Sequence, residues 1–203
     1  MLTLPNLLTI SRVPLMFAVV GLMYAEFNLS ATIAFWLYIA VALTDWFDGM
    51  LARRANQVSS FGRFMDAVID KVLVLGLMVA LINGGYFIFL GRDYSLVAML
   101  LWMGILCREF AISGLRMAAA VRQVTIEADQ GGKVKTFVQL NAIGWILGAR
   151  MLTQDWGTLF PPDERFIITA VHSLGLLLYV ASAVLTVTSG WSYFRRHGHV
   201  VMD

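Results

Sequence analysis

The feature that most constrains the fold of this chain is a set of four aspartates inside strongly apolar segments. They are Asp45, Asp48, Asp66 and Asp70. At about 100° per residue, the first two share one helix face and the last two share another. If one helix runs to about Arg54 and the next begins near Phe61, both pairs lie at the same depth, roughly 9 Å below the turn that joins the helices. The spacing therefore predicts a helical hairpin whose carboxylates face one another.

Composition places this hairpin in a membrane. Of 203 residues, 59% are hydrophobic and only 14% are charged, a balance that is uncommon in soluble domains. The sequence predicts six membrane helices, each longer than the roughly 20 residues that a span requires, at roughly 5–27, 30–54, 61–90, 94–120, 132–153 and 164–194. Short polar connections join them, and no linker or repeat divides the chain. We therefore expect an all-α integral membrane protein with a single domain over residues 1–203.

Four carboxylates at one depth in a membrane need a compensating charge. Each aspartate at the centre of a membrane helix costs about 2.5 to 3.5 kcal/mol, and four unpaired ones would cost on the order of 10 kcal/mol. Oxygen ligands suit Mg²⁺, Mn²⁺ and Ca²⁺, and four clustered carboxylates are enough to hold two such ions. The alternative is pairing with the nearby basic residues Arg53, Arg54, Arg63 and Lys71. Pairing alone does not explain why the carboxylates face each other.

Basic residues concentrate on one side of the predicted helices. That side carries Arg12, Arg53, Arg54, Arg63, Arg116, Arg122, Lys133, Lys135, Arg195 and Arg196, and the other side carries Arg92 and Arg165. Since cytoplasmic loops are enriched in Lys and Arg, we expect both termini and the carboxylate hairpin to face the cytoplasm. The net charge of +2 does not indicate nucleic acid. Its concentration on one side suits anionic lipid or a phosphorylated substrate.

Further charged residues lie within or beside the fourth and fifth predicted spans. Arg108, Arg116, Lys133 and Lys135 all point toward the predicted cytoplasmic half. Cations beside a metal site favour a pocket for an anionic substrate, because Arg contacts phosphate through two donors and Lys supplies a point charge. The alternative for Arg108 is pairing with Glu109 or extension of its side chain to the interface. Gly49 and Gly62 would let a nucleotide approach the helix backbone closely, although glycine also serves helix packing.

Other polar or aromatic residues have structural interpretations. Trp156, Trp191 and Tyr193 lie near predicted span ends, where aromatic side chains commonly anchor at lipid headgroups. His172 lies deep in the last span, where packing or a helix–helix hydrogen bond is expected. Cys107 is expected to be a packing residue.

The run Asp45-x2-Asp48-Gly49-x2-Ala52-Arg53-x8-Gly62-x3-Asp66-x3-Asp70 matches without a gap the signature of the CDP-alcohol phosphotransferase family. Three further segments resemble the bacterial phosphatidylglycerophosphate synthase branch of that family. They are Asn6-x2-Thr9-x2-Arg12, Arg108-Glu109-Phe110 through Ser113-Gly114-Leu115-Arg116, and Gly132-Lys133-x-Lys135-Thr136-x2-Gln139. The resemblance covers about residues 5 to 140, and the last two spans match only in length and hydrophobicity.

This resemblance implies a six-helix homodimeric enzyme of the cell inner membrane that acts in phospholipid biosynthesis. It would displace CMP from CDP-diacylglycerol with sn-glycerol 3-phosphate. By the same resemblance, Asp45, Asp48, Asp66 and Asp70 would bind two divalent ions, Mg²⁺ or Mn²⁺, and Asp70 would also be the general base. CDP-diacylglycerol would contact Asn6, Thr9, Gly49, Arg53, Ser59 and Gly62, and the phosphate of the acceptor would meet Arg108, Arg116, Lys133 and Lys135.

Two other functions remain open from the sequence. A synthase of the same family would use another acceptor, such as inositol phosphate, serine or phosphatidylglycerol, although the basic cluster argues against an uncharged or zwitterionic alcohol. A cation transporter would also carry carboxylates inside the membrane. Transport predicts carboxylates spread along several helices, whereas the four aspartates share one hairpin and one depth.

Overall fold

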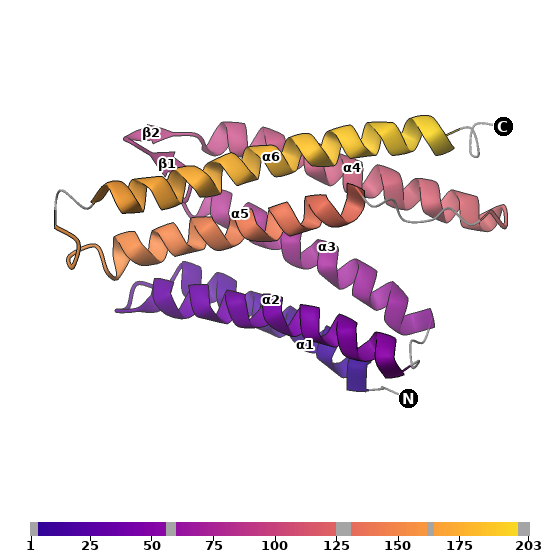
Figure 1. The fold of residues 1–203 in the computed structure, drawn as a ribbon, viewed down its shortest axis with the longest axis horizontal. Coiled ribbons are helices and arrows are strands. Elements are labelled where there is room, and N and C mark those ends of the chain that lie inside the picture. The colour runs from indigo at the N-terminus through magenta and orange to yellow at the C-terminus, as the bar shows by residue number, and fades with distance from the viewer. Residues whose placement is uncertain (1–3, 56–59, 125–130, 162–164, 199–203) are drawn as a thin grey trace.

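The computed structural model describes residues 4–55, 60–124, 131–161 and 165–198, and within them it does not describe the side chains of residues 4–9, 45–55, 60–64, 66, 131 and 133. The protein is 82% helical. The helices of the described ranges are α1 Leu4–Met23, α2 Ser30–Ala55, α3 Ser60–Asn83, α4 Ser95–Val121, α5 Gly131–Gln154 and α6 Arg165–His197 (Figure 1). The predicted all-α class and the order of six helices are confirmed.

The first helix ends earlier than predicted, at Met23 rather than residue 27. Beyond it, the Tyr24 hydroxyl donates a hydrogen bond to the Ala80 carbonyl of α3 (2.9 Å) and accepts one from the Asn83 amide (3.0 Å). Leu29 then takes a φ of 68°, which a helix does not allow. The apolar residues after Met23 therefore form a turn rather than more helix. Hydropathy did not predict this, because a loop that packs against a helix can be as apolar as the helix itself.

The third helix also ends before its predicted limit, because Asn83-Gly84-Gly85 stops it. Gly85 has a φ of 73°, and the Tyr86 N–H donates to the Leu81 carbonyl (3.2 Å). This is a Schellman cap, in which a glycine takes the left-handed conformation. The chain then forms a two-stranded antiparallel hairpin, β1 Ile88–Phe89 and β2 Arg92–Asp93, instead of the predicted helix to residue 90.

The tip of that hairpin is Leu90-Gly91, with φ angles of 49° and 77°. Two consecutive residues with positive φ are typical of the tight hairpin turn whose twist matches the strands. The hairpin packs beside α6, where the His172 ring nitrogen Nε2 lies 2.9 Å from the Tyr86 carbonyl and the ring contacts Phe89 edge-on. The hydrogen bond expected for His172 is confirmed, although its partner is a turn rather than a helix.

Two aspartates satisfy backbone groups at helix starts on this side of the bundle. Asp155 Oδ2 accepts hydrogen bonds from the N–H and the hydroxyl of Thr32, both 2.7 Å, in the first turn of α2. Asp93 accepts one from the N–H of Ser95 at the start of α4 (2.8 Å), and the hydrogen bonds from Ser95 hold the pKa of Asp93 below its usual value. Negative charge beside the free N–H groups of a helix start is favourable.

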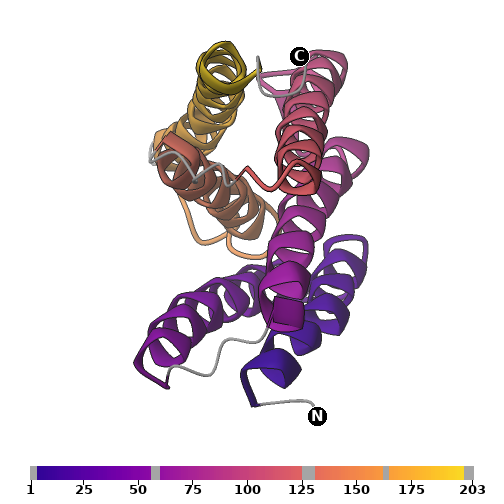
Figure 2. The same ribbon diagram turned by 90° about the vertical axis from the view of Figure 1, so that its right-hand side faces the viewer.

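The helices pack as two groups, α1 with α2 and α4 with α5 and α6, which are joined by α3 and by contacts between α2 and α5. Helix α1 contacts both α2 and α3, α5 contacts α6 along much of its length, and α4 contacts α6 and α3. Figure 2 shows α3 crossing from the α1–α2 group toward α4. Two buried tyrosines join helices through hydrogen bonds. Tyr38 of α2 donates to the Leu140 carbonyl of α5 (2.6 Å) and so connects the two groups, and Tyr179 of α6 donates to the Ala98 carbonyl of α4 (3.0 Å) within one group. Their polar atoms are therefore satisfied inside the core.

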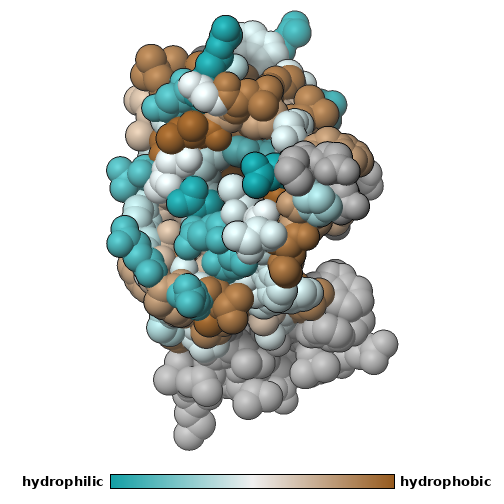
Figure 3. All heavy atoms as spheres, turned by 90° about the vertical axis from the view of Figure 1, so that its left-hand side faces the viewer, coloured by the Kyte–Doolittle hydropathy of each residue, from teal (hydrophilic) through white to brown (hydrophobic). Residues whose placement is uncertain are grey.

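Two of the described helices, α4 and α6, are long and apolar enough to cross a membrane by length and composition. Large apolar side chains lie exposed on both, including Leu100 and Phe110 of α4 and Leu177 of α6. The end of the bundle that carries the hairpin gathers hydrophilic residues at its centre, with hydrophobic residues around them (Figure 3). Arg150 also lies at this end, over the Tyr86 ring, so the basic residues there are not limited to the predicted Arg92 and Arg165.

Candidate active site

The structure places the four aspartates on the two helices that the sequence predicts. Asp45 and Asp48 lie in α2, which runs to Ala55, and Asp66 and Asp70 lie in α3, which begins at Ser60. By helix rise, Asp48 and Asp66 are both roughly 9 to 10 Å from the ends that face the connecting segment. The bounds of the two helices agree with those from which the match in depth was predicted, and the convergence of the carboxylates stays a prediction. The side chains of Asp45, Asp48 and Asp66 lie outside the described residues.

The side chain of Asp70 is described, and it pairs with an arginine that the sequence analysis did not assign to the site. Arg12 of α1 donates from one terminal nitrogen to Asp70 Oδ1 at 3.3 Å. The Arg12 side chain is 3% exposed, whereas that of Asp70 is 47% exposed. A buried guanidinium thus holds a carboxylate that remains accessible. This partner is not one of the neighbouring basic residues, Arg53, Arg54, Arg63 and Lys71, that the sequence offered for such a pair.

A narrow cavity of about 40 Å³ lies beside this pair, where α1, α2, α3 and α5 meet. Arg12, Asp70 and Thr136 supply its polar atoms, and Val41, Leu73 and Val74 contribute apolar walls. It shares Tyr38, Ala42 and Leu140 with a much larger apolar groove of about 610 Å³ between α2 and α5. The cavity that Asp70 lines and the apolar groove are therefore neighbours, with Tyr38, Ala42 and Leu140 common to both.

The groove suits an apolar chain. Its walls include Phe35 and Leu43 of α2 and Phe137 and Trp145 of α5, and Asn141 contributes an amide. A volume of this size is within the range of ligand pockets.

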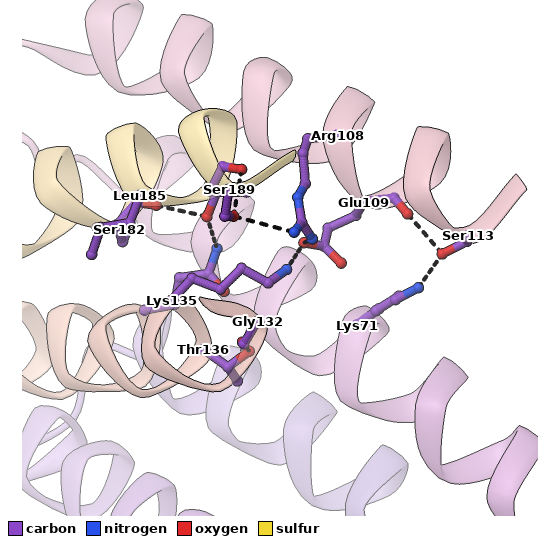
Figure 4. A network of polar contacts seen from close by, with 12 residues as sticks. Lys71, Arg108, Glu109, Ser113, Gly132, Lys135, Thr136, Ser182, Leu185 and Ser189 are labelled. Atoms are coloured by element: carbon purple, nitrogen blue, oxygen red, sulfur yellow. Dashed lines mark hydrogen bonds and ion pairs between the residues drawn. The ribbon is translucent and has the colours of Figure 1, made fainter. Parts of the chain in front are cut away.

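A second polar centre lies where α4, α5 and α6 meet (Figure 4). Glu109 Oε1 accepts hydrogen bonds from Arg108 (3.0 Å) and from the Lys135 ammonium. All three side chains are mostly buried, with exposed fractions of 12% for Arg108, 11% for Glu109 and 7% for Lys135. Two basic side chains share one carboxylate, so basic groups outnumber acidic groups by one within this triad.

Lys71 connects the two centres, since it follows Asp70 in α3 and reaches α4. Its ammonium donates to the Ser113 hydroxyl, which in turn donates to the Glu109 carbonyl at 2.7 Å (Figure 4). The sequence analysis considered Lys71 only as a partner for an aspartate. Through its contact with Ser113, Lys71 places another ammonium group beside the helix that carries Arg108 and Glu109.

Arg116 lies two turns further along α4. Its Nε donates to the Tyr193 hydroxyl (3.0 Å), and its guanidinium lies 5.4 Å from the centre of the Tyr193 ring. Tyr193 is 2% exposed and packs with Ile112 and Leu115. The prediction that Tyr193 anchors at the interface is therefore wrong, because its ring is buried against α4 and its hydroxyl accepts a hydrogen bond from the exposed Arg116.

The predicted site residues differ in how far the structure describes them. Arg108 and Lys135 converge on Glu109, and Arg116 lies on the same helix as Arg108. The remaining predicted contacts fall outside the described residues, entirely for Ser59 and in their side chains for Asn6, Thr9, Gly49, Arg53, Gly62 and Lys133. Sequence reasoning missed Arg12 and Ser189 because each finds its partner on a distant helix.

The residues of the α2–α3 hairpin fit divalent cations by donor type. Oxygen donors from carboxylates are the ligands that Mg²⁺ and Mn²⁺ prefer, and the accessible carboxylate of Asp70 opens onto a cavity. Among the described side chains there is no group of three potential metal ligands. The side chains of Asp45, Asp48 and Asp66 are not among those described.

The structure is thus a helical bundle with two helices that could cross a membrane, and it holds an accessible carboxylate paired with a buried arginine and a second centre with two buried basic side chains. The model of the CDP-alcohol phosphatidyltransferase family matches residues 2–188, and the chain therefore belongs to this family. Proteins of the family are embedded in membranes and generally depend on divalent metal ions.

The chain is similar to several proteins named CDP-diacylglycerol–glycerol-3-phosphate 3-phosphatidyltransferase. The protein of Rickettsia typhi is 31% identical over 196 residues, which cover 96% of this chain and 97% of the relative. That of Bacillus subtilis is 30% identical over 212 residues, covering 97% and 96%. That of Salmonella choleraesuis is 35% identical over 182 residues, covering 89% and 93%.

Proposed function

We propose that this protein transfers the phosphatidyl group from CDP-diacylglycerol to sn-glycerol 3-phosphate and releases CMP. The observation that carries the proposal is the buried triad of Arg108, Glu109 and Lys135 beside the carboxylate hairpin. Its excess of basic over acidic groups suits an acceptor that itself bears a phosphate. The names of relatives that match over nearly the whole chain support the same reaction.

In the proposed reaction, a hydroxyl oxygen of the acceptor forms a bond to the phosphorus that carries the diacylglycerol. The anhydride bond to CMP breaks, and the hydroxyl proton passes to Asp70. Arg12 keeps the Asp70 carboxylate oriented through the contact at 3.3 Å. Positioning and charge stabilisation then supply most of the acceleration, as in other phosphoryl transfers.

Asp45, Asp48, Asp66 and Asp70 would hold two divalent cations, Mg²⁺ or Mn²⁺. When bound, such ions supply charge neutralisation at the diphosphate. The nucleotide would contact Asn6, Thr9, Gly49, Arg53, Ser59 and Gly62. One acyl chain would occupy the apolar groove between α2 and α5, because the groove lies next to the cavity that Asp70 lines.

The phosphate of the acceptor would bind Arg108, Arg116, Lys133 and Lys135. Lys71 adds a cation on the side of Asp70, so the acceptor would lie between the triad and the carboxylates. An inositol phosphate or the phosphodiester of phosphatidylglycerol would also bring negative charge to these cations, whereas zwitterionic serine brings no net charge. Competition among these acceptors separates the alternatives.

We further propose that the chain is one catalytic domain in which all six helices span the inner membrane. The apolar exposure of α4 and α6 supports spans for these two. Both termini and the site would face the cytoplasm, where basic residues are enriched. The protein would act as a homodimer.

The proposal is tested with the purified protein in detergent, supplied with CDP-diacylglycerol, Mg²⁺ and labelled sn-glycerol 3-phosphate. CMP release together with labelled lipid is expected, and Asp70→Asn should abolish both. CMP release with another alcohol and no labelled lipid would keep the family reaction and overturn the acceptor. Uptake of cations into vesicles without CMP release would instead support the transporter.

A further inference from the structure

Arg108 crosses the gap from α4 to α6 directly over Gly190. A Cβ built at Gly190 would overlap Cγ of Arg108 and would lie 2.9 Å from its Nε and 3.2 Å from its Cδ. Cγ is close to the helix backbone, so it moves away only if the side chain leaves its rotamer. Because Gly190 has no side chain, the stem of Arg108 can fill the space beside it.

The end of the Arg108 side chain is held at two further points. One terminal nitrogen donates to Ser189 Oγ at 3.2 Å, and the other donates to Glu109 Oε1 at 3.0 Å (Figure 4). The Ser189 hydroxyl itself donates to the Thr186 carbonyl at 3.0 Å, which fixes its orientation. The stem and the guanidinium of Arg108 are thus both held in place by neighbouring residues. Two of these neighbours, Ser189 and Gly190, are consecutive residues of α6.

We infer that Gly190 and Ser189 are positioning residues that aim the Arg108 guanidinium at the phosphate of the acceptor. Contact of a guanidinium with phosphate through two donors depends on the direction of its plane. Displacement of the stem would therefore weaken acceptor binding, although neither residue touches the acceptor. This inference rests on the proposed function, and it gives α6, for which the sequence suggested no role, a part in choosing the acceptor.

The decisive variant is Gly190→Ala, assayed in the full-length protein with both substrates varied. We expect KM for sn-glycerol 3-phosphate to rise about tenfold, as for the loss of one hydrogen bond to a charged group, with little change in KM for CDP-diacylglycerol. Ser189→Ala removes a hydrogen bond without adding bulk and should raise the same KM by a smaller factor. It keeps the test informative if Gly190→Ala folds poorly.

The matched control is Gly175→Ala in the same helix. A Cβ there would lie 2.8 Å from Cγ1 and 3.0 Å from the backbone nitrogen of Ile146, so this position is also crowded, but against α5 and not against Arg108. We expect it to lower thermal stability and to leave the ratio of the two KM values unchanged. A general packing effect would move both glycine variants alike.

A double-mutant cycle with Arg108→Ala completes the test. If Gly190 acts through Arg108, adding Gly190→Ala to Arg108→Ala should not raise the KM for the acceptor further, because coupled residues are not additive. An additive effect, or an equal rise in both KM values for Gly190→Ala alone, would overturn the positioning role. A wild-type protein that forms no labelled lipid would refute the proposed function itself, so the two failures are distinguishable.

Discussion

Replacement of Lys135 by methionine tests the proposed acceptor site most directly. The Lys135 side chain is 7% exposed and its ammonium contacts Glu109, which also accepts a hydrogen bond from Arg108. Methionine keeps most of the apolar stem and removes the charge. The Arg108–Glu109 pair remains, so the triad changes from one excess basic group to none.

The magnitude follows from the contact that is lost. A hydrogen bond to a charged group contributes about 1.5 to 3 kcal/mol, and since about 1.4 kcal/mol is a factor of ten, KM for sn-glycerol 3-phosphate should rise roughly 10- to 100-fold. KM for CDP-diacylglycerol should change much less, because its nucleotide is expected at the carboxylate hairpin. Glu109 keeps a cationic partner at 3.0 Å, so no buried charge is left alone and the protein should stay folded.

The assay measures initial rates of CMP release while each substrate is varied at saturation of the other. Arg150→Met is the matched control, since it removes a cation from the opposite end of the same helix, where Arg150 lies over the Tyr86 ring. It should leave both KM values unchanged. Equal changes in both KM values for Lys135→Met, or the same change for Arg150→Met, would refute the assignment of Lys135 to the acceptor.

Other perturbations separate chemistry from stability. Chelation of divalent cations should abolish CMP release and added Mg²⁺ should restore it, whereas Asp70→Asn should stay inactive at any Mg²⁺ concentration; activity in the presence of chelator would contradict the proposed metal dependence. Asp155→Ala removes two hydrogen bonds of 2.7 Å to Thr32 and should lower the free energy of unfolding by about 1 to 2 kcal/mol, with both KM values intact. Tyr38→Phe removes the hydrogen bond to the Leu140 carbonyl and should lower the melting temperature by about 2 to 4 °C. An unchanged melting temperature would show that this bond contributes no net stability.

Helix order and the position of the aspartates followed from the sequence because they depend on local patterns. Apolar runs predicted all six helices, and the spacing around Asp48 and Asp66 placed them at matched depth. The pattern failed where a special backbone conformation interrupts an apolar run. Asn83-Gly84-Gly85 is a stop signal of this kind, and the hydropathy of the residues that follow concealed it.

The sequence could not predict which side chains contact one another across helices. Arg12 and Asp70 are 58 residues apart, and Arg108 and Ser189 are 81 apart. Their contacts depend on how α1 meets α3 and how α4 meets α6, which no local spacing encodes. The sequence offered pairing of Arg108 with Glu109 as an alternative to substrate binding. The structure shows that pair and also shows why pairing does not remove the charge, since Lys135 shares the same carboxylate.

Polar side chains have different roles at the two ends of the bundle. At the end with the β1–β2 hairpin, Asp155, Tyr24 and His172 bond to backbone groups and so close turns or begin helices. Near the triad, cations instead outnumber the carboxylate that they contact among the described side chains. Excess charge inside an apolar bundle is unfavourable unless an opposite charge arrives. An anionic acceptor provides that charge, so substrate binding would both fill the site and relieve its repulsion, and the acceptor should raise the melting temperature of the wild-type protein more than that of Lys135→Met.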